Sequence, residues 1–300
     1  MKKIGSGLAT NFNDPGICAL NVIVRSKGFP ILCLHGHPGC GESMSVFTDH
    51  LSQRFQTLAP DLRGYGKSAT KNDFEMRDHL QDLEALLEAQ KIKQCLVLGW
   101  SLGGIIGLEL ALQRPEIVSG LILVASAAKP RSSHPSVSWQ DLAYTGIASL
   151  INRAIPSWQW NIETFAKRSL YRYLVAQHTP IAYKYLADNA MTAYLQTSKP
   201  AVRALNKALR EGYNRLERLP ELECPCLVLA GDADRHITAE SSLETAQNIR
   251  DCEFHCYPNT AHLFPWEIPN QVLADIDRWI QLHPQAVGRP NVLGADGNGK

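Results

Sequence analysis

A serine between two glycines is the part of this sequence best suited to chemistry. In Gly99-Trp100-Ser101-Leu102-Gly103 the serine follows an apolar run, 95–98, and precedes a helical pattern over 102–114. A sharp turn from strand to helix leaves no room for side chains beside the serine, so glycines flank it and its hydroxyl is exposed. The stretch therefore predicts a nucleophilic serine, with helix capping as the alternative role for Ser101.

A serine hydroxyl needs a base to take its proton and an acid to orient that base. Asp234 lies in the loop after an apolar strand-like run, 226–229, and His262 lies in the loop after the next one, 253–257. The chain order Ser101, Asp234, His262 is then nucleophile, acid, base. We expect these three side chains to meet, with Asp232 as the competing acid and His236 as the competing base.

The elements that must position these loops are short apolar strands that alternate with helical patterns. Strands are predicted at 31–34, 57–59, 95–98, 121–124, 226–229 and 253–257, and helices at 44–54, 77–90, 102–114 and 270–282. Residues 4–24 contain β-like pieces broken by a turn signal, which predicts an entry hairpin or meander. The alternation predicts an α/β fold with a doubly wound, mostly parallel sheet and helices on both faces.

The alternation stops between residues 129 and 219, which predicts a helical lid inserted into a core formed by residues 1–128 and 220–284. The lid holds 13 Lys or Arg against 5 Asp or Glu, whereas the rest of the chain holds 17 against 24. It also holds seven of the nine tyrosines, with Trp139, Trp158 and Trp160. We expect these aromatic residues to pack the lid onto the core and the basic residues to be solvated. The alternative is that the basic lid attracts an anionic substrate or an acidic carrier protein. Residues 285–300 are expected to be a disordered tail.

On these residues the chain resembles the α/β-hydrolase superfamily. The matching stretches are His35-Gly36-His37-Pro38-Gly39, Asp61-Leu62-Arg63-Gly64-Tyr65-Gly66-Lys67-Ser68, the turn at Ser101, Gly231-Asp232-Ala233-Asp234, and His262. The resemblance implies that Ser101 attacks, His262 transfers its proton and Asp234 fixes the imidazole. It also implies that the backbone N–H groups of His37 and Leu102 hold the oxyanion, and that no metal or organic cofactor is required.

The same resemblance favours a carboxylesterase acting on a small-molecule or carrier-linked ester or thioester. His-Gly-His-Pro-Gly is also similar to a loop of proline iminopeptidases, which keeps amide hydrolysis open. An aspartate at position 101 would instead indicate haloalkane or epoxide chemistry. Some chains of this fold serve only as ligand receptors or binding partners, and that hypothesis stays open too.

Composition excludes several other classes. The net charge is +1, no apolar stretch is long enough to span a membrane, and no secretory signal is expected. Cys33, Cys95 and Cys226 sit in apolar runs, which is typical of buried thiols in a reducing cytoplasm. Gly66-Lys67-Ser68 resembles the end of a phosphate loop, but Asp61 stands where the first glycine of that loop belongs. We expect no nucleic-acid partner.

Overall fold

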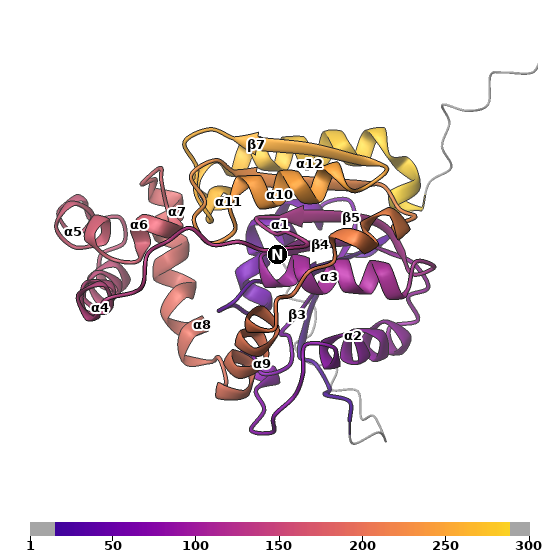
Figure 1. Ribbon diagram of the computed structural model, residues 1–300, viewed down its shortest axis with the longest axis horizontal. Helices are drawn as coiled ribbons and strands as arrows, with labels where there is room; N and C mark the ends of the chain where they lie inside the picture. Colours follow the sequence, from indigo (N-terminus) through magenta and orange to yellow (C-terminus); the bar gives the residue numbers. More distant parts are fainter. Residues whose placement is uncertain (1–15, 289–300) are drawn as a thin grey trace, which may run out of the picture.

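The computed structural model describes residues 16–288 of the chain. The strands in this part form one seven-stranded sheet (Figure 1). The strand order is β1-β3-β2-β4-β5-β6-β7, and every pair is parallel except β1 with β3. The strands are β1 (Val22–Arg25), β2 (Pro30–Leu34), β3 (Gln56–Pro60), β4 (Cys95–Trp100), β5 (Val118–Val124), β6 (Cys226–Gly231) and β7 (Cys252–Tyr257). The predicted mostly parallel sheet is confirmed.

Helices cover both faces of this sheet, because side chains on alternate positions of each strand point to opposite sides. Ile31 and Cys33 of β2 pack on the side of α1 (Ser45–Leu51) and α12 (Pro269–Leu282). Leu32 and Leu34 pack on the side of α2 (Asp78–Ala89), α3 (Leu102–Gln113) and α10 (Ala239–Gln247). Since both faces are buried, the central strands read as continuous apolar runs, and the chain is doubly wound as predicted.

Between β5 and β6 the chain forms only helices. They are α4 (Trp139–Ala154), α5 (Gln159–Thr164), α6 (Tyr171–Leu174), α7 (Pro180–Tyr185), α8 (Met191–Leu195) and α9 (Lys199–Arg210), and Figure 1 shows α4 and α5 at the end of the molecule farthest from α2 and α12. We call residues 129–219 the inserted segment. The short helix α11 (Phe264–Glu267) follows β7 and precedes α12.

The two ends of the described chain differ from expectation. Residues 16–25 hold one strand, β1, which pairs antiparallel with β3 instead of forming a hairpin of its own, and residues 1–15 lie outside the described part. The tail predicted from residue 285 is wrong at its start, because Pro284–Val287 is a 3-10 helix whose Ala286 is fully buried. The Ser119 hydroxyl donates a 2.8 Å hydrogen bond to the Ala286 carbonyl. Residues 289–300 lie outside the described part.

The aromatic residues of the inserted segment divide into two groups. Tyr171, Tyr173, Tyr183 and Tyr185 are buried, as expected of residues that pack the segment. Trp139, Trp158 and Trp160 are 76%, 43% and 50% exposed, so the expectation that they pack the segment onto the core is wrong.

Two exposed basic residues of the inserted segment form ion pairs with acidic residues of the core at the surface. Ion pairs join Arg203 to Asp73 and, at 2.9 Å, Lys207 to Glu75. The positive segment and the negative core therefore neutralise one another in part where α9 crosses the loop before α2. Five basic residues of the segment have no carboxylate partner within residues 16–288, namely Lys129, Arg153, Arg168, Lys199 and Arg210.

Candidate active site

Ser101 stands at the turn between β4 and α3 with a strained backbone. Its φ of 53° and ψ of −117° lie outside the regions that side chains favour, which is a common sign of a functional constraint. A side chain on Gly99 or Gly103 would collide with backbone, at Gly103 and Leu34 respectively. The close passage of β4, α3 and β2 therefore requires the flanking glycines and leaves the Ser101 side chain partly exposed.

The structure brings His262 and Asp234 to this serine. His262 Nε2 lies 3.0 Å from Ser101 Oγ, and His262 Nδ1 lies 2.7 Å from Asp234 Oδ2. Asp234 and His262 are 3% and 5% exposed. Because a carboxylate can only accept, Nδ1 carries the hydrogen and Nε2 is left to accept the Ser101 hydroxyl proton. All three predicted residues come together from three separate loops.

The other oxygen of Asp234 fixes the acid in place. Asp234 Oδ1 accepts hydrogen bonds from the backbone N–H groups of His236, at 2.8 Å, and Ile237, at 3.1 Å. The competing acid, Asp232, is exposed, and its side chain contacts the Thr260 N–H at 3.3 Å instead of His262. Of the two acids, the geometry therefore selects Asp234.

His236, the competing base, is a neighbour of His262 and not a partner of Ser101. Its ring centroid lies 5.2 Å from that of His262 and 5.0 Å from that of His134. Burial and the neighbouring His262 lower the pKa of His236 to about 3, so its imidazole is neutral. Its Nε2 is buried and has no hydrogen-bond partner among residues 16–288. The sequence analysis named His236 as a site candidate, and the structure places it beside His262 without a contact to Ser101.

Two backbone N–H groups are candidates for an oxyanion hole. Leu102 is the first residue of α3, so its N–H belongs to the helix end that has no acceptor within the helix. His37 lies in the loop after β2, and its N–H has no acceptor among the described residues. A Cβ on the adjacent Gly36 would lie 3.1 Å from Ser101 Cβ, so this loop runs directly beside the serine.

Two buried histidine contacts hold the loop after β2. Nδ1 of His35 lies 2.8 Å from the Gly36 carbonyl, and its Nε2 accepts the Leu62 N–H at 3.1 Å. Burial lowers the pKa of His35 to about 4, so the ring is neutral with its hydrogen on Nδ1. Nδ1 of His37 lies 3.0 Å from the Tyr65 hydroxyl, and burial lowers its pKa to about 4 as well. The loop is thus held by neutral rings.

The stretch that resembles a phosphate loop has a structural role. Asp61 accepts hydrogen bonds from the backbone N–H groups of Gly41, at 2.7 Å, and Lys67, at 2.9 Å. It also accepts one from the Asn21 amide at 2.9 Å. Asp61 therefore ties three segments together, those of Asn21, Gly41 and Lys67.

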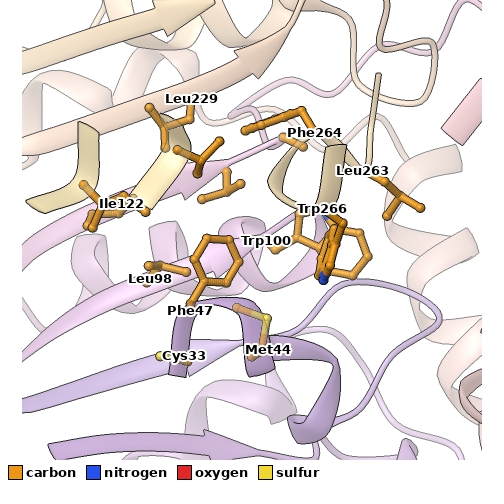
Figure 2. Packing of buried hydrophobic residues seen from close by; sticks show 14 of the residues in the cluster. Cys33, Met44, Phe47, Leu98, Trp100, Ile122, Leu229, Leu263, Phe264 and Trp266 are labelled. Atoms are coloured by element: carbon orange, nitrogen blue, oxygen red, sulfur yellow. The ribbon is translucent and has the colours of Figure 1, made fainter. Parts of the chain in front are cut away.

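An aromatic cluster supports the site from the side of α11. Figure 2 shows Trp100 and Trp266 in contact, with Phe47 and Met44 nearby. The ring centroids of Trp266 and Tyr185, the latter from the inserted segment, lie 4.0 Å apart with stacked planes. The inserted segment is therefore packed against the residues that follow His262.

Glu267 links the same two parts by hydrogen bonds, and the sequence analysis missed it. Its buried carboxylate accepts the N–H groups of Ala261, at 2.9 Å, Ala176, at 3.1 Å, and Gln177. Burial raises its pKa, while these backbone donors favour the charged form. A charged residue inside the apolar run 263–268 was the signal that could have found it.

Within residues 16–288, no helix is both long and apolar enough to cross a bilayer, and no cluster of three His, Cys, Asp or Glu side chains is arranged to hold a metal ion. All eight cysteines are free thiols, and Cys33, Cys95 and Cys226 are buried in strands as predicted.

The sequence model of the alpha/beta hydrolase fold family matches residues 30–269. A pimeloyl-[acyl-carrier protein] methyl ester esterase of Vibrio atlanticus (strain LGP32) is 26% identical over 244 residues, which cover 80% of this chain and 89% of the relative. A haloalkane dehalogenase of Mesorhizobium japonicum is 23% identical over 273 residues, which cover 85% of each. A solved thermophilic esterase from Thermogutta terrifontis superposes with a TM-score of 0.66 at 24% identity, covering 88% of this chain and 93% of that one.

Proposed function

Because the chain belongs to the α/β-hydrolase fold family, we propose that it is a serine esterase that forms an acyl-enzyme on Ser101. The observation that carries the proposal is the pair of contacts of His262, 3.0 Å to Ser101 Oγ and 2.7 Å to Asp234 Oδ2. A hydroxyl, a neutral imidazole and a buried carboxylate in that order form a nucleophile with its base and the group that orients the base.

In the first step Ser101 Oγ attacks the ester carbonyl carbon while its proton moves to His262 Nε2. The carbonyl oxygen becomes an oxyanion, which the N–H groups of Leu102 and His37 stabilise. The tetrahedral intermediate then collapses, and the alcohol leaves with the proton from His262. Asp234 stabilises the imidazolium and keeps the hydrogen on Nδ1.

In the second step water is the nucleophile. His262 takes one proton from the water, and the oxygen of that water attacks the acyl carbon. Collapse of this second intermediate releases the carboxylic acid and returns the proton to Ser101 Oγ. The scheme uses the same three side chains twice and needs no cofactor.

The substrate that we propose is a carboxylic ester, with an anionic or carrier-linked ester as the narrower proposal. Support for the narrower proposal comes from the five unpaired basic residues of the inserted segment and from the relative in Vibrio atlanticus, whose name specifies a carrier-linked methyl ester. A positive segment raises the local concentration of an anionic substrate, and salt screens this attraction. The free thiols support action in a reducing cytoplasm, which we also propose.

A substrate panel tests the proposed function. It contains p-nitrophenyl esters of increasing acyl length, a methyl ester linked to an acyl carrier protein, acyl thioesters and prolyl amides. We expect turnover of esters by the wild type and none by Ser101→Ala. Turnover of prolyl amides alone would contradict an esterase and favour a peptidase, and binding without turnover of any of these would favour a ligand-binding protein.

A matched pair of substrates tests the narrower proposal. We expect kcat/KM for an anionic ester to fall as salt is raised, while that for a neutral ester of the same length stays constant. Equal salt dependence of the two esters would remove the anionic preference and leave the esterase proposal intact.

A further inference from the structure

The helix α4 is packed with its polar face inward. Asp141 pairs with Arg172 at 2.7 Å, and the Thr145 hydroxyl accepts the Leu170 N–H at 3.0 Å. Two turns further, the fully buried Asn152 amide donates to the Tyr183 carbonyl at 2.8 Å. These contacts fix the rotation of α4 about its axis, because each uses the side of the helix that faces α6 and α7.

The opposite face of α4 is apolar and exposed. Trp139, Leu142 and Leu150 are 76%, 59% and 63% exposed, and a Cβ on Gly146 would meet no atom within 4 Å. Surface helices usually turn their apolar stripe inward, so this arrangement is the reverse of the ordinary one. Figure 1 shows α4 at the outer end of the inserted segment, and no described residue covers this face. An apolar face of this kind is typical of an interaction surface.

The exposed face is complementary to itself. Counted outward from Gly146, Leu142 stands four residues before it and Leu150 four after, while Trp139 stands seven before and Arg153 seven after. Consider a second α4 that lies antiparallel to the first, with a two-fold axis at Gly146. Leu142 of each copy then meets Leu150 of the other, and Trp139 of each copy meets Arg153 of the other. A two-fold interface requires this reciprocity.

The chemistry of each pair favours that contact. Arg153 is exposed and has no carboxylate partner within residues 16–288, so its guanidinium is available to stack on a tryptophan ring. Gly146 at the axis lets the two helix backbones approach closely. The antiparallel arrangement also keeps the two arginines at opposite ends, whereas a parallel one would bring them together.

We propose that α4 is a dimerisation helix, and that its occupant is the α4 of a second copy of this chain. The helix is about 24 Å long at 1.5 Å per residue. Stable interfaces bury roughly 800 Å² per partner, more than one helix face supplies. Trp158 and Trp160, whose ring centroids lie 5.0 Å apart and which are half exposed, form a second exposed apolar pair after α4 in the chain.

Sedimentation velocity from low to high micromolar concentration tests the proposal on the full chain. We expect a monomer–dimer equilibrium in the wild type. Leu150→Glu is expected to raise the dimer Kd at least about 100-fold, because the two-fold axis applies the substitution twice at the centre of the contact. The matched control is Leu195→Glu on α8, at a side chain 73% exposed in the same inserted segment, which should leave the Kd unchanged.

An exchange of residues tests the antiparallel register. Trp139→Arg alone and Arg153→Trp alone each remove the mixed pair, and we expect each to weaken the dimer. The double substitution restores one arginine opposite one tryptophan, and we expect it to recover most of the affinity. Circular dichroism and ester hydrolysis of each variant show that the chain is folded.

Three results would overturn the proposal. The first is a monomer at every concentration. The second is a dimer that Leu150→Glu leaves intact, which would place the contact elsewhere. The third is a monomer that binds phosphatidylglycerol vesicles and loses that binding in Leu150→Glu, which would make the face a lipid-binding surface.

Discussion

The Glu267 carboxylate accepts a 2.9 Å hydrogen bond from the backbone N–H of Ala261, the residue before His262. The same carboxylate holds the N–H groups of Ala176 and Gln177 in the inserted segment. A second backbone bond, from the Leu263 N–H to the Leu174 carbonyl at 2.9 Å, runs beside it. The loop that carries His262 is thus held between the core and the inserted segment, and the position of the base depends on both.

The Glu267→Gln variant tests this dependence. Oε1 accepts the Ala261 N–H and Oε2 accepts those of Ala176 and Gln177. The amide has one acceptor oxygen and one NH2 group, so it loses the bonds of one side and His262 shifts. A shift of this kind far from the bond-making atoms costs about 10- to 100-fold in rate. We expect kcat for a p-nitrophenyl ester to fall by that factor with little change in KM.

The control is Glu240→Gln, at an exposed acid on α10. It should leave kcat unchanged. If Glu267→Gln is folded, as judged by its thermal midpoint, and retains wild-type kcat, the carboxylate does not position His262.

The two acids of the loop after β6 should differ in effect. Asp234→Asn removes the acceptor that keeps the hydrogen on Nδ1 of His262, and the wrong tautomer lowers kcat by about 10⁴-fold in enzymes of this type. Asp232→Asn changes an exposed side chain, and kcat should stay within about twofold of wild type. Steady-state kinetics on both variants measure the two values of kcat. A larger loss of kcat in Asp232→Asn than in Asp234→Asn would show that Asp232, and not Asp234, orients His262.

Acid should destabilise the fold through His35. Its pKa is about 4 when folded, because of burial, and near 6.5 when unfolded. The unfolded chain therefore binds the extra proton between these values, and the free energy of unfolding falls as pH falls through that window. From pH 7.5 to 5.0 this one group removes roughly 2 kcal/mol.

Urea denaturation of the wild type and of His35→Gln at the two pH values measures this effect. The variant should be less stable at pH 7.5, since it loses a buried ring, but its stability should fall less toward pH 5.0. The same pH dependence in both proteins would mean that His35 is not the group that takes up the proton.

The sheet and the meeting of Ser101, Asp234 and His262 were predictable because one rule governs them. Parallel strands end at the same edge of a sheet, so loops that follow different strands converge there. The order of the three residues then follows from the order of the strands. Gly99 and Gly103 also indicate the turn in the sequence, because the backbones of β4, α3 and β2 pass too closely there for a side chain.

The remaining features depend on contacts that sequence periodicity does not report. Glu267 acts between Ala261 and Ala176, and this pairing exists only once the inserted segment has folded back on the loop after β7. Trp139 was expected to pack because aromatic residues at helical spacing usually form a buried face, but the polar contacts of Asp141 and Asn152 turn α4 the other way. Ala286 was assigned to a tail because an apolar pair after Pro284 is too short to show a pattern.

Covalent labelling with a fluorophosphonate probe, followed by peptide mapping, tests the role of Ser101 most directly. The probe reacts with a serine only when a neighbouring base removes its proton. We expect one labelled residue, Ser101, no labelling of Ser101→Ala, and slow labelling of His262→Ala. A folded wild-type protein that remains unlabelled, or that carries the label on another residue, would contradict the account.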